Sequence, residues 1–244
     1  MPKFFVPKEN ISEDKIMITG EDVQHIKRVL RMRVGEELVL CDSCGTDYTT
    51  RLAEIGDRDI LCDILDKTQS QTEPNIKVTL FQGLPKASKM DYIIQKTTEL
   101  GITKIVPCAL GRCVSKPEGD KKTARWQKIA EEAAKQSGRG AIPDVTNVVK
   151  LDEAIKELSG CDLAFVPYEC EEMRSIKSVL TSKSDIKTVG FIIGPEGGFD
   201  KAEIEKLENA GIAPVSLGKR ILRTETAGEA VLAMVMYEIG DANL

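Results

Sequence analysis

Two glycine-containing segments in the C-terminal part of the chain carry residue types suited to binding a small molecule. Residues 194–198 read Gly-Pro-Glu-Gly-Gly after an apolar run, and Gly218 follows a second apolar run. The carboxyl ends of parallel strands form the ligand-binding edge of an open α/β sheet. Glycines there let backbone groups approach a ligand that the main chain recognises, such as an adenine edge. A simple turn between a strand and a helix is the alternative interpretation.

Charged residues crowd the segment after Gly218. Arg220, Arg223 and Glu225 precede an apolar helix expected over 226–239. A helix N-terminus favours anions, so Arg223 there indicates an acidic group or ligand close by. The competing interpretation is a structural ion pair of Arg223 with Glu225 or with Glu196.

Several other site chemistries lack the residues that they need. The glycine segments match neither the dinucleotide motif G-x-G-x-x-G nor a phosphate loop. His25 is the only histidine, which excludes chemistry that needs two. Cys41 and Cys44 have zinc-ligand spacing, but no second pair completes the set. A strand end followed by a turn over 42–45 is the favoured interpretation.

Composition predicts a globular protein of one large or two small domains. The 244 residues are 41% hydrophobic and 30% charged, with a net charge of −5. No apolar run is long enough to span a membrane, and the first residues lack a signal-peptide layout, so we expect a cytoplasmic protein.

The net negative charge argues against a protein that coats nucleic acid, so any RNA contact must use a local patch. One candidate patch is Lys27, Arg28, Arg31 and Arg33, of which the first three share a helical face by spacing. A solvated helix face is the alternative.

The N-terminal part predicts a small β-barrel. Helical spacing over 21–32 places Val23, Ile26, Val29 and Leu30 on one apolar stripe. The polar segment 68–75 contains proline and is typical of a linker, so we place a domain boundary near residue 72. Short strands at close spacing around the helix give the barrel, and we expect them over 4–6, 16–18, 37–41, 46–55 and 60–65.

The pattern then alternates strand and helix, which predicts parallel strands with crossover helices. The last helix is apolar on nearly every side, so it must be buried either in the core or against a partner chain. Strands are expected over 77–84, 104–110, 162–167, 188–193 and 214–217, and helices over 91–100, 121–137, 152–158, 171–180, 201–210 and 226–239.

Four motifs together carry a family resemblance. Residues 191–199, 216–227, 95–101 and 136–139 resemble the ribosomal small-subunit RNA uridine-N3 methyltransferases of the SPOUT superfamily, and the resemblance spans nearly the whole chain. Residues 25–31 are similar to the PUA-like RNA-binding barrel of that family. Lys3 departs from it, because an arginine is expected there and lysine lacks the forked geometry for a bidentate phosphate contact.

The resemblance implies an α/β fold class: a PUA-like barrel over 1–72, then a SPOUT domain with a trefoil knot and a mostly parallel sheet over 73–244. It also implies S-adenosylmethionine as cofactor, a homodimer through the last helix, and N3 of a uridine in 16S ribosomal RNA of the small subunit as the target. A methyltransferase of tRNA or of a ribose 2′-hydroxyl and a non-catalytic ribosome-assembly factor are the alternatives.

The cofactor residues follow from the resemblance by position, whereas the catalytic residues are a hypothesis from the chemistry of the implied transfer. Arg223 or Arg112 would stabilise negative charge on the base, and Glu225 or Glu99 would accept the N3 proton or orient the arginine. No metal is needed for this transfer. The cofactor would be bound by Pro167, Gly194, Pro195, Glu196, Gly197, Leu217, Gly218, Ile221, Leu222 and Arg223, and RNA by Lys3, Lys27, Arg28, Arg31, Arg33 and Arg139.

Overall fold

The computed structural model describes residues 1–115 and 119–242, which form two compact units. The first unit is Met1–Glu73 with Ala134–Ile142, and the second is Pro74–Ala133 with Pro143–Leu244. The sequence placed one boundary near residue 72 and did not assign 134–142 to the N-terminal domain. The two units are therefore joined by more than one covalent crossing of the chain.

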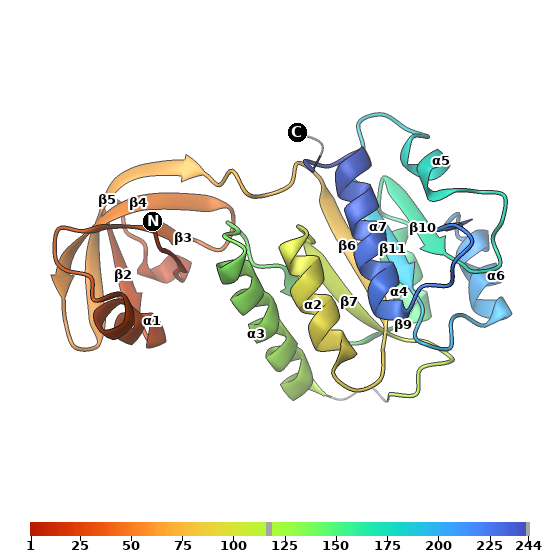
Figure 1. Cartoon of the computed structure of the whole chain (residues 1–244), viewed down its shortest axis with the longest axis horizontal. Helices are drawn as coiled ribbons and strands as arrows, with labels where there is room; N and C mark the ends of the chain where they lie inside the picture. The colour runs from red at the N-terminus through yellow and green to blue at the C-terminus, as the bar shows by residue number, and fades with distance from the viewer. Residues whose placement is uncertain (116–118, 243–244) are drawn as a thin grey trace. The chain divides into compact units, whose positions relative to one another are not determined.

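A curled five-stranded sheet forms the N-terminal unit, with strand order β1-β3-β4-β5-β2 (Figure 1). All its neighbouring strands are antiparallel except β1 and β3, which are parallel. Irregular pairing between β4 and β5 bends this long strand pair. The expected PUA-like barrel is confirmed as this curled sheet. Its strands are β1 (Lys3–Phe5), β2 (Lys15–Thr19), β3 (Glu37–Cys41), β4 (Thr46–Ile55) and β5 (Asp59–Gln69), with a 3-10 turn η1 at Lys8–Asn10.

The expected helix over 21–32 is wrong in its second half. Helix α1 (Glu21–Gln24) continues as a π-helical segment, η2 (His25–Leu30), and Arg31 then adopts a left-handed conformation with φ of 53°. A π turn contains more residues than an α turn, so residues after Ile26 rotate away from the buried face. Val29 is 66% exposed as a result, instead of lying on the apolar stripe.

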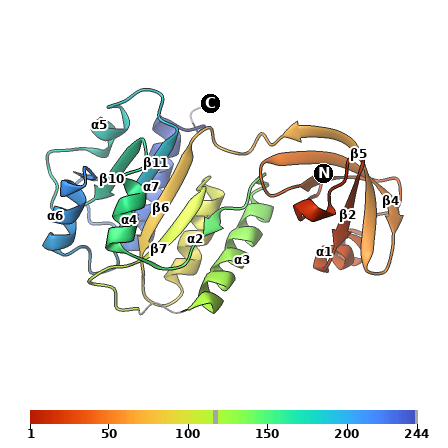
Figure 2. The same ribbon diagram turned by 180° about the vertical axis from the view of Figure 1, so that it is seen from behind.

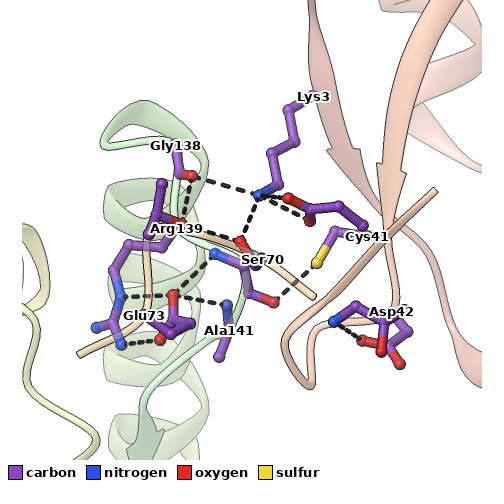
Figure 3. Close-up of polar contacts among 12 residues, drawn as sticks. Lys3, Cys41, Asp42, Ser70, Glu73, Gly138, Arg139 and Ala141 are labelled. Carbon is purple, nitrogen blue, oxygen red and sulfur yellow. Dashed lines mark hydrogen bonds and ion pairs between the residues drawn. The ribbon is translucent and has the colours of Figure 1, made fainter. Parts of the chain in front are cut away.

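The polar segment 68–75 is not a free linker (Figure 3). Strand β5 runs to Gln69, and Ser70 is buried. The Glu73 carboxylate accepts hydrogen bonds from the backbone N–H groups of Gly140 and Ala141, at 2.8 and 3.0 Å. Residues 68–73 therefore belong to the N-terminal unit, and Glu73 binds the segment 134–142 within that unit.

The turn interpretation at Cys41 is confirmed. Strand β3 ends there, and Asp42 Oδ1 accepts hydrogen bonds from the backbone N–H groups of Cys44 and Thr46. The buried Cys41 thiol donates to the Gly140 carbonyl at 2.8 Å, and burial raises the pKa of this thiol to about 12. Cys41 is therefore a packed thiol in the core of the unit.

A seven-stranded parallel sheet is the centre of the second unit, as the alternating pattern predicted. The strand order is β12-β10-β11-β6-β7-β8, and β9 also pairs with β7. The two short strands β8 and β9 have no counterpart in the sequence prediction. The strands are β6 (Lys77–Gly83), β7 (Lys104–Ala109), β8 (Asp144–Val145), β9 (Val149–Lys150), β10 (Leu163–Pro167), β11 (Thr188–Ile193) and β12 (Ala213–Val215).

Helices cover both faces of this sheet. Apolar residues of α2, α3, α5 and α7 share one core with one face, and those of α4 and α6 share a second core with the other. Figure 1 shows α2 and α7 in front of the sheet, and Figure 2 shows α4 on the opposite side. The helices are α2 (Lys89–Glu99), α3 (Asp120–Gln136), α4 (Leu151–Leu158), α5 (Ile176–Leu180), α6 (Lys201–Asn209) and α7 (Thr224–Glu238).

One helix of this unit is shorter than expected. A helix was predicted over 171–180, but α5 begins only after Ser175, whose hydroxyl accepts a hydrogen bond from the backbone N–H of Ser178. Before that, the Glu171 side chain accepts hydrogen bonds from the N–H groups of Met173 and Arg174. This side-chain turn competes with helix formation over 171–174.

Helix α7 is only partly buried within the chain. Its inner face packs on the sheet, while Ala233, Met234 and Tyr237 are exposed, Tyr237 to 65%. The expectation that this helix is covered on all sides therefore does not hold for one chain alone. Across the described part of the protein, no helix combines the length and apolar character that a membrane crossing requires.

Candidate functional site

The carboxyl ends of β10, β11 and β12 surround one cavity of about 510 Å³ within the second unit. The three segments that follow these strands form most of its wall, as the strand-end rule predicts for a parallel sheet. All ten residues expected to bind the cofactor line this cavity: Pro167, Gly194, Pro195, Glu196, Gly197, Leu217, Gly218, Ile221, Leu222 and Arg223.

Two glycines on the wall adopt backbone conformations that other residues rarely reach. Gly198 has φ of +68°, and a Cβ there would lie 2.9 Å from the Glu169 carboxylate. Gly218 has φ of +100°. Both positions therefore favour glycine, and both residues line the cavity. The two interpretations of these glycine segments, a turn after a strand and a ligand-binding loop, are therefore compatible.

Lys89 is a charged residue of the wall that the sequence analysis missed. Its Nζ lies 3.1 Å from Glu196 Oε1 and 3.2 Å from Glu225 Oε2. The contacts with Glu196 and then Glu225 raise the pKa of Lys89, which keeps the amine charged. Lys89 starts α2 in the segment after β6, so applying the strand-end rule to β6 as well would have found it.

Glu196 and Glu225 are both paired with Lys89 and not with Arg223. An ion pair of Arg223 with Glu196 or Glu225 was the structural alternative, but both carboxylates contact Lys89. The Arg223 side chain has no hydrogen bond or ion pair to any residue in 1–115 or 119–242, and it is exposed on the cavity wall. A cation in this state is available to a bound anion.

Glu196 is the more strongly held of the two glutamates. Burial works to raise its pKa, but hydrogen bonds from backbone N–H groups, including that of Lys86, and the contact with Lys89 outweigh it, so the pKa of Glu196 is lowered. A carboxylate with a lowered pKa is a weak proton acceptor, so Glu196 is better suited to orienting Lys89.

Three of the four residues expected to act in catalysis, Arg112, Glu99 and Glu225, lie outside the cavity lining. Arg112 donates from Nε to Asp200 Oδ1 at 2.7 Å and from Nη1 to the Gly197 carbonyl at 2.8 Å, so it braces a cavity loop from behind. Glu99 pairs with Lys96 on the same helix at 2.8 Å. Neither placement fits direct contact with a reacting base. Of the four, Arg223 lines the cavity directly, and Glu225 is connected to the cavity wall through its contact with Lys89.

Four of the six residues expected to bind RNA lie on or just after the η2 segment. Arg28, Arg31 and Arg33 are exposed, and their guanidinium groups have no hydrogen bond or ion pair to any residue in the described ranges. Lys27 donates to the Gly56 carbonyl at 2.7 Å, so its amine is held on the barrel. Arg31 lies beyond the helix, so the shared helical face predicted for 27, 28 and 31 is wrong.

Lys3 and Arg139 have internal roles that do not fit the expected RNA contacts (Figure 3). Lys3 Nζ pairs with Asp47 at 2.8 Å and is mostly covered. Arg139 is 3% exposed, and its guanidinium pairs with the Glu73 carboxylate at 2.6 Å. Arg139 is buried and Lys3 is held by an internal ion pair, so neither side chain is presented as a free surface charge.

Comparison with known proteins places both units in described families. The RNA methyltransferase domain family matches residues 72–236, and the RNA methyltransferase PUA domain family matches residues 18–65. Together the two matches cover most of both structural units.

Individual relatives align over nearly the full length of the chain. Ribosomal RNA small subunit methyltransferase E of Bacillus subtilis is 34% identical, over 98% of this chain and 97% of that protein. The protein of the same name from Aquifex aeolicus is 31% identical over 95% of this chain and 98% of its own length. The crystal structure of the Neisseria gonorrhoeae protein of that name, bound to S-adenosyl methionine, superposes with a TM-score of 0.88 at 32% identity and covers 99% of both chains.

Proposed function

The chain belongs to the RNA methyltransferase family, and from this premise we propose that it transfers the methyl group of S-adenosylmethionine to N3 of a uridine in 16S ribosomal RNA of the small ribosomal subunit. The observation that carries the proposal is the cavity that all ten expected cofactor residues line together. A ribosomal substrate implies a cytoplasmic location.

The cavity suits S-adenosylmethionine in size and in chemistry. Its volume of about 510 Å³ is within the usual range for pockets that enclose a small molecule. Leu217, Ile221 and Leu222 offer apolar surface for an adenine ring, and the glycine turns offer peptide groups for its polar edge. Glu169 and Glu196 provide negative charge for a cationic ligand.

The glycines support the same fit. A Cβ at Gly197 would lie 3.0 Å from the Arg112 side chain, and one at Gly198 would press on Glu169. The turn therefore depends on the absence of side chains at these positions. The trefoil knot that the resemblance implies in this region belongs to the proposal.

When bound, S-adenosylmethionine supplies an activated methyl group. Uridine N3 carries a proton at neutral pH, so the protein must help to remove it and stabilise the negative charge that develops on the base carbonyls. Arg223 is an exposed cation on the wall, and its side chain has no hydrogen bond or ion pair to any residue in the described ranges. Glu225, held by Lys89, is the proton acceptor in this scheme.

RNA would reach the site through contacts by the N-terminal unit. Arg28, Arg31 and Arg33 form an exposed cationic segment without internal partners among the described residues. Such contacts to phosphates position the RNA without reading its sequence. The target uridine must leave its stack to reach the cavity.

A homodimer completes the proposal. The exposed Ala233, Met234 and Tyr237 form an apolar face on α7, and a second copy of the chain would cover it. Apolar side chains on a helix otherwise packed in the core favour such an interface.

The function is tested by incubating the protein with labelled S-adenosylmethionine and either small ribosomal subunits that lack their own modification or tRNA, followed by mass analysis of the released nucleosides. N3-methyluridine from the ribosomal particles is the expected result. A 2′-O-methylated nucleoside, or label in tRNA alone, would instead favour the alternative enzymes. Cofactor binding without transfer to either RNA would favour an assembly factor.

A further inference from the structure

A fully buried amide lies directly behind the candidate cofactor cavity. Gln82 is near the carboxyl end of the central strand β6, between the apolar Phe81 and Gly83, and it is 0% exposed. Burying an amide is costly unless its polar atoms are hydrogen-bonded. A glutamine at this position therefore calls for a specific set of partners.

The Gln82 amide begins a directed chain of hydrogen bonds. Its Nε2 donates to the Thr224 hydroxyl at 2.9 Å and to the Gly83 carbonyl at 3.0 Å. The Thr224 hydroxyl in turn donates to the Gly194 carbonyl at 2.6 Å. A hydroxyl has one proton, so Thr224 must accept from Gln82 while it donates to Gly194.

The orientation of the amide follows from the same contacts. If Nε2 and Oε1 exchanged places, the Gln82 oxygen would face the Gly83 carbonyl, and two acceptors would oppose each other. The amide is therefore fixed with Nε2 toward Thr224. Its Oε1 receives no hydrogen bond from any residue in 1–115 or 119–242.

The chain of hydrogen bonds connects two walls of the cavity. Gly194 begins the glycine turn after β11, and Thr224 begins α7 directly after Arg223. Both residues line the cavity, while Gln82 itself does not. Figure 1 shows β6 beside β11, with α7 across them.

Packing alone does not explain Gln82. An apolar side chain of similar volume would fill the same space without leaving a buried oxygen unpaired. What only the amide provides is a donor for the Thr224 hydroxyl, which forces that hydroxyl to donate toward Gly194. The free-energy cost of burying Oε1 without a partner is therefore offset by the orientation that the amide gives to the Thr224 hydroxyl at the cavity wall.

We propose that Gln82 is a positioning residue for cofactor binding: through Thr224 it fixes the Gly194 carbonyl and so the spacing between the glycine turn and the start of α7. The inference rests on the proposed function, in which this cavity holds S-adenosylmethionine. It assigns Gln82 no contact with the cofactor or with the RNA.

The test compares binding of S-adenosylmethionine by calorimetry with the melting temperature of the unliganded protein. Gln82→Met and Thr224→Val each break the chain of hydrogen bonds and should weaken binding about tenfold, which corresponds to the loss of one buried hydrogen bond. Thr224→Ser keeps the hydroxyl and should bind like the wild type. The double variant Gln82→Met/Thr224→Val should bind no more weakly than either single variant, because both remove the same connection.

Thr97→Val is the matched control. It removes another buried hydroxyl, which donates to the Ile93 carbonyl at 2.7 Å inside α2, and it should lower only the melting temperature. The inference is overturned if Gln82→Met and Thr224→Val lower the melting temperature but leave the Kd unchanged, or if Thr97→Val weakens binding equally. A wild-type protein that fails to bind S-adenosylmethionine would overturn the proposed function itself.

Discussion

At the residue scale, Arg223 and Glu225 are close in sequence but have different surroundings. Glu225 contacts Lys89 at 3.2 Å, whereas Arg223 is exposed at the cavity without a partner among the described residues. Glu225 is therefore a carboxylate held in position, whereas Arg223 is a cation available to the substrate. This difference is why the two residues receive different roles in the proposed transfer.

Replacement of Arg223 by alanine should lower kcat about 100-fold at saturating S-adenosylmethionine, the typical effect of removing one group that stabilises developing charge. Arg223→Lys keeps a charge and should retain part of the rate. Methyl transfer to small ribosomal subunits measures both. Unchanged turnover in Arg223→Ala would remove this residue from the chemistry.

Glu229 on α7 gives a pH-dependent prediction. Burial raises the pKa of its carboxyl, as do Glu225 and Glu99, while Lys96 partly offsets them. The folded state therefore holds this proton more tightly than the unfolded chain, whose value is near 4.5. Consequently, the Glu229 contribution to the free energy of unfolding falls as pH rises through the range from 4.5 to the folded pKa.

Glu229→Gln should therefore be more stable than the wild type at pH 7, with less difference between the two at pH 4. Urea unfolding at both pH values measures this. Glu205→Gln, at an exposed position of α6, is the control for a general loss of negative charge. Equal stability changes at pH 4 and pH 7 would contradict a raised pKa at Glu229.

At the element scale, the η2 segment explains why a basic patch found by helical spacing has a different geometry in the structure. The π turn and the left-handed Arg31 place Arg28, Arg31 and Arg33 on an exposed segment rather than on one helix face. Helical periodicity assumes a constant number of residues per turn, so it could not predict this change.

Arg28→Ala combined with Arg31→Ala should weaken RNA binding and reduce the slope of log K against log salt by about 0.7–0.9 for each phosphate that the variant no longer neutralises. Cofactor affinity should not change. Arg51→Ala removes an exposed charge from β4, where it pairs with Glu37, and should leave the slope intact. A double variant with the wild-type slope would show that this segment does not grip RNA.

Helix α7 makes the second prediction at this scale. Met234→Glu places a charge on its exposed apolar face and should convert a dimer to a monomer, because burying an unpaired carboxylate at an interface is costly. Light scattering after size-exclusion chromatography measures the mass. Met173→Glu, at a 95% exposed position outside α7, should leave the mass unchanged. A dimeric Met234→Glu variant would exclude this face as the interface.

At the scale of the whole molecule, the sequence predicted the cavity better than it predicted the boundary between the units. Strand ends and glycine turns are local patterns, so they located Gly194 and Gly218 at one edge of the sheet. Lys89 was missed because it reaches the same edge from a helix start after a different strand. Only the folded chain brings these segments together.

Residues 134–142 show why the sequence pattern could not assign every segment to its structural unit. They include the last residues of α3, a helix that is predictable from its own periodicity, yet they pack with the N-terminal unit through contacts to residues far away in sequence. The buried pair of Arg139 with Glu73 is such a contact, and it reassigns an arginine that resembled a surface charge. Burial and pairing of this kind are properties of the tertiary structure.

The most direct test of the proposed activity is the yield of N3-methyluridine in small ribosomal subunits treated in parallel with the wild type and with Gly198→Val. Valine at a φ of +68°, with its Cβ against Glu169, should distort the glycine turn and abolish the product, while circular dichroism shows an intact fold. The wild type alone should yield N3-methyluridine. No N3-methyluridine with the wild type, or equal yields with both proteins, would contradict the proposed use of this cavity.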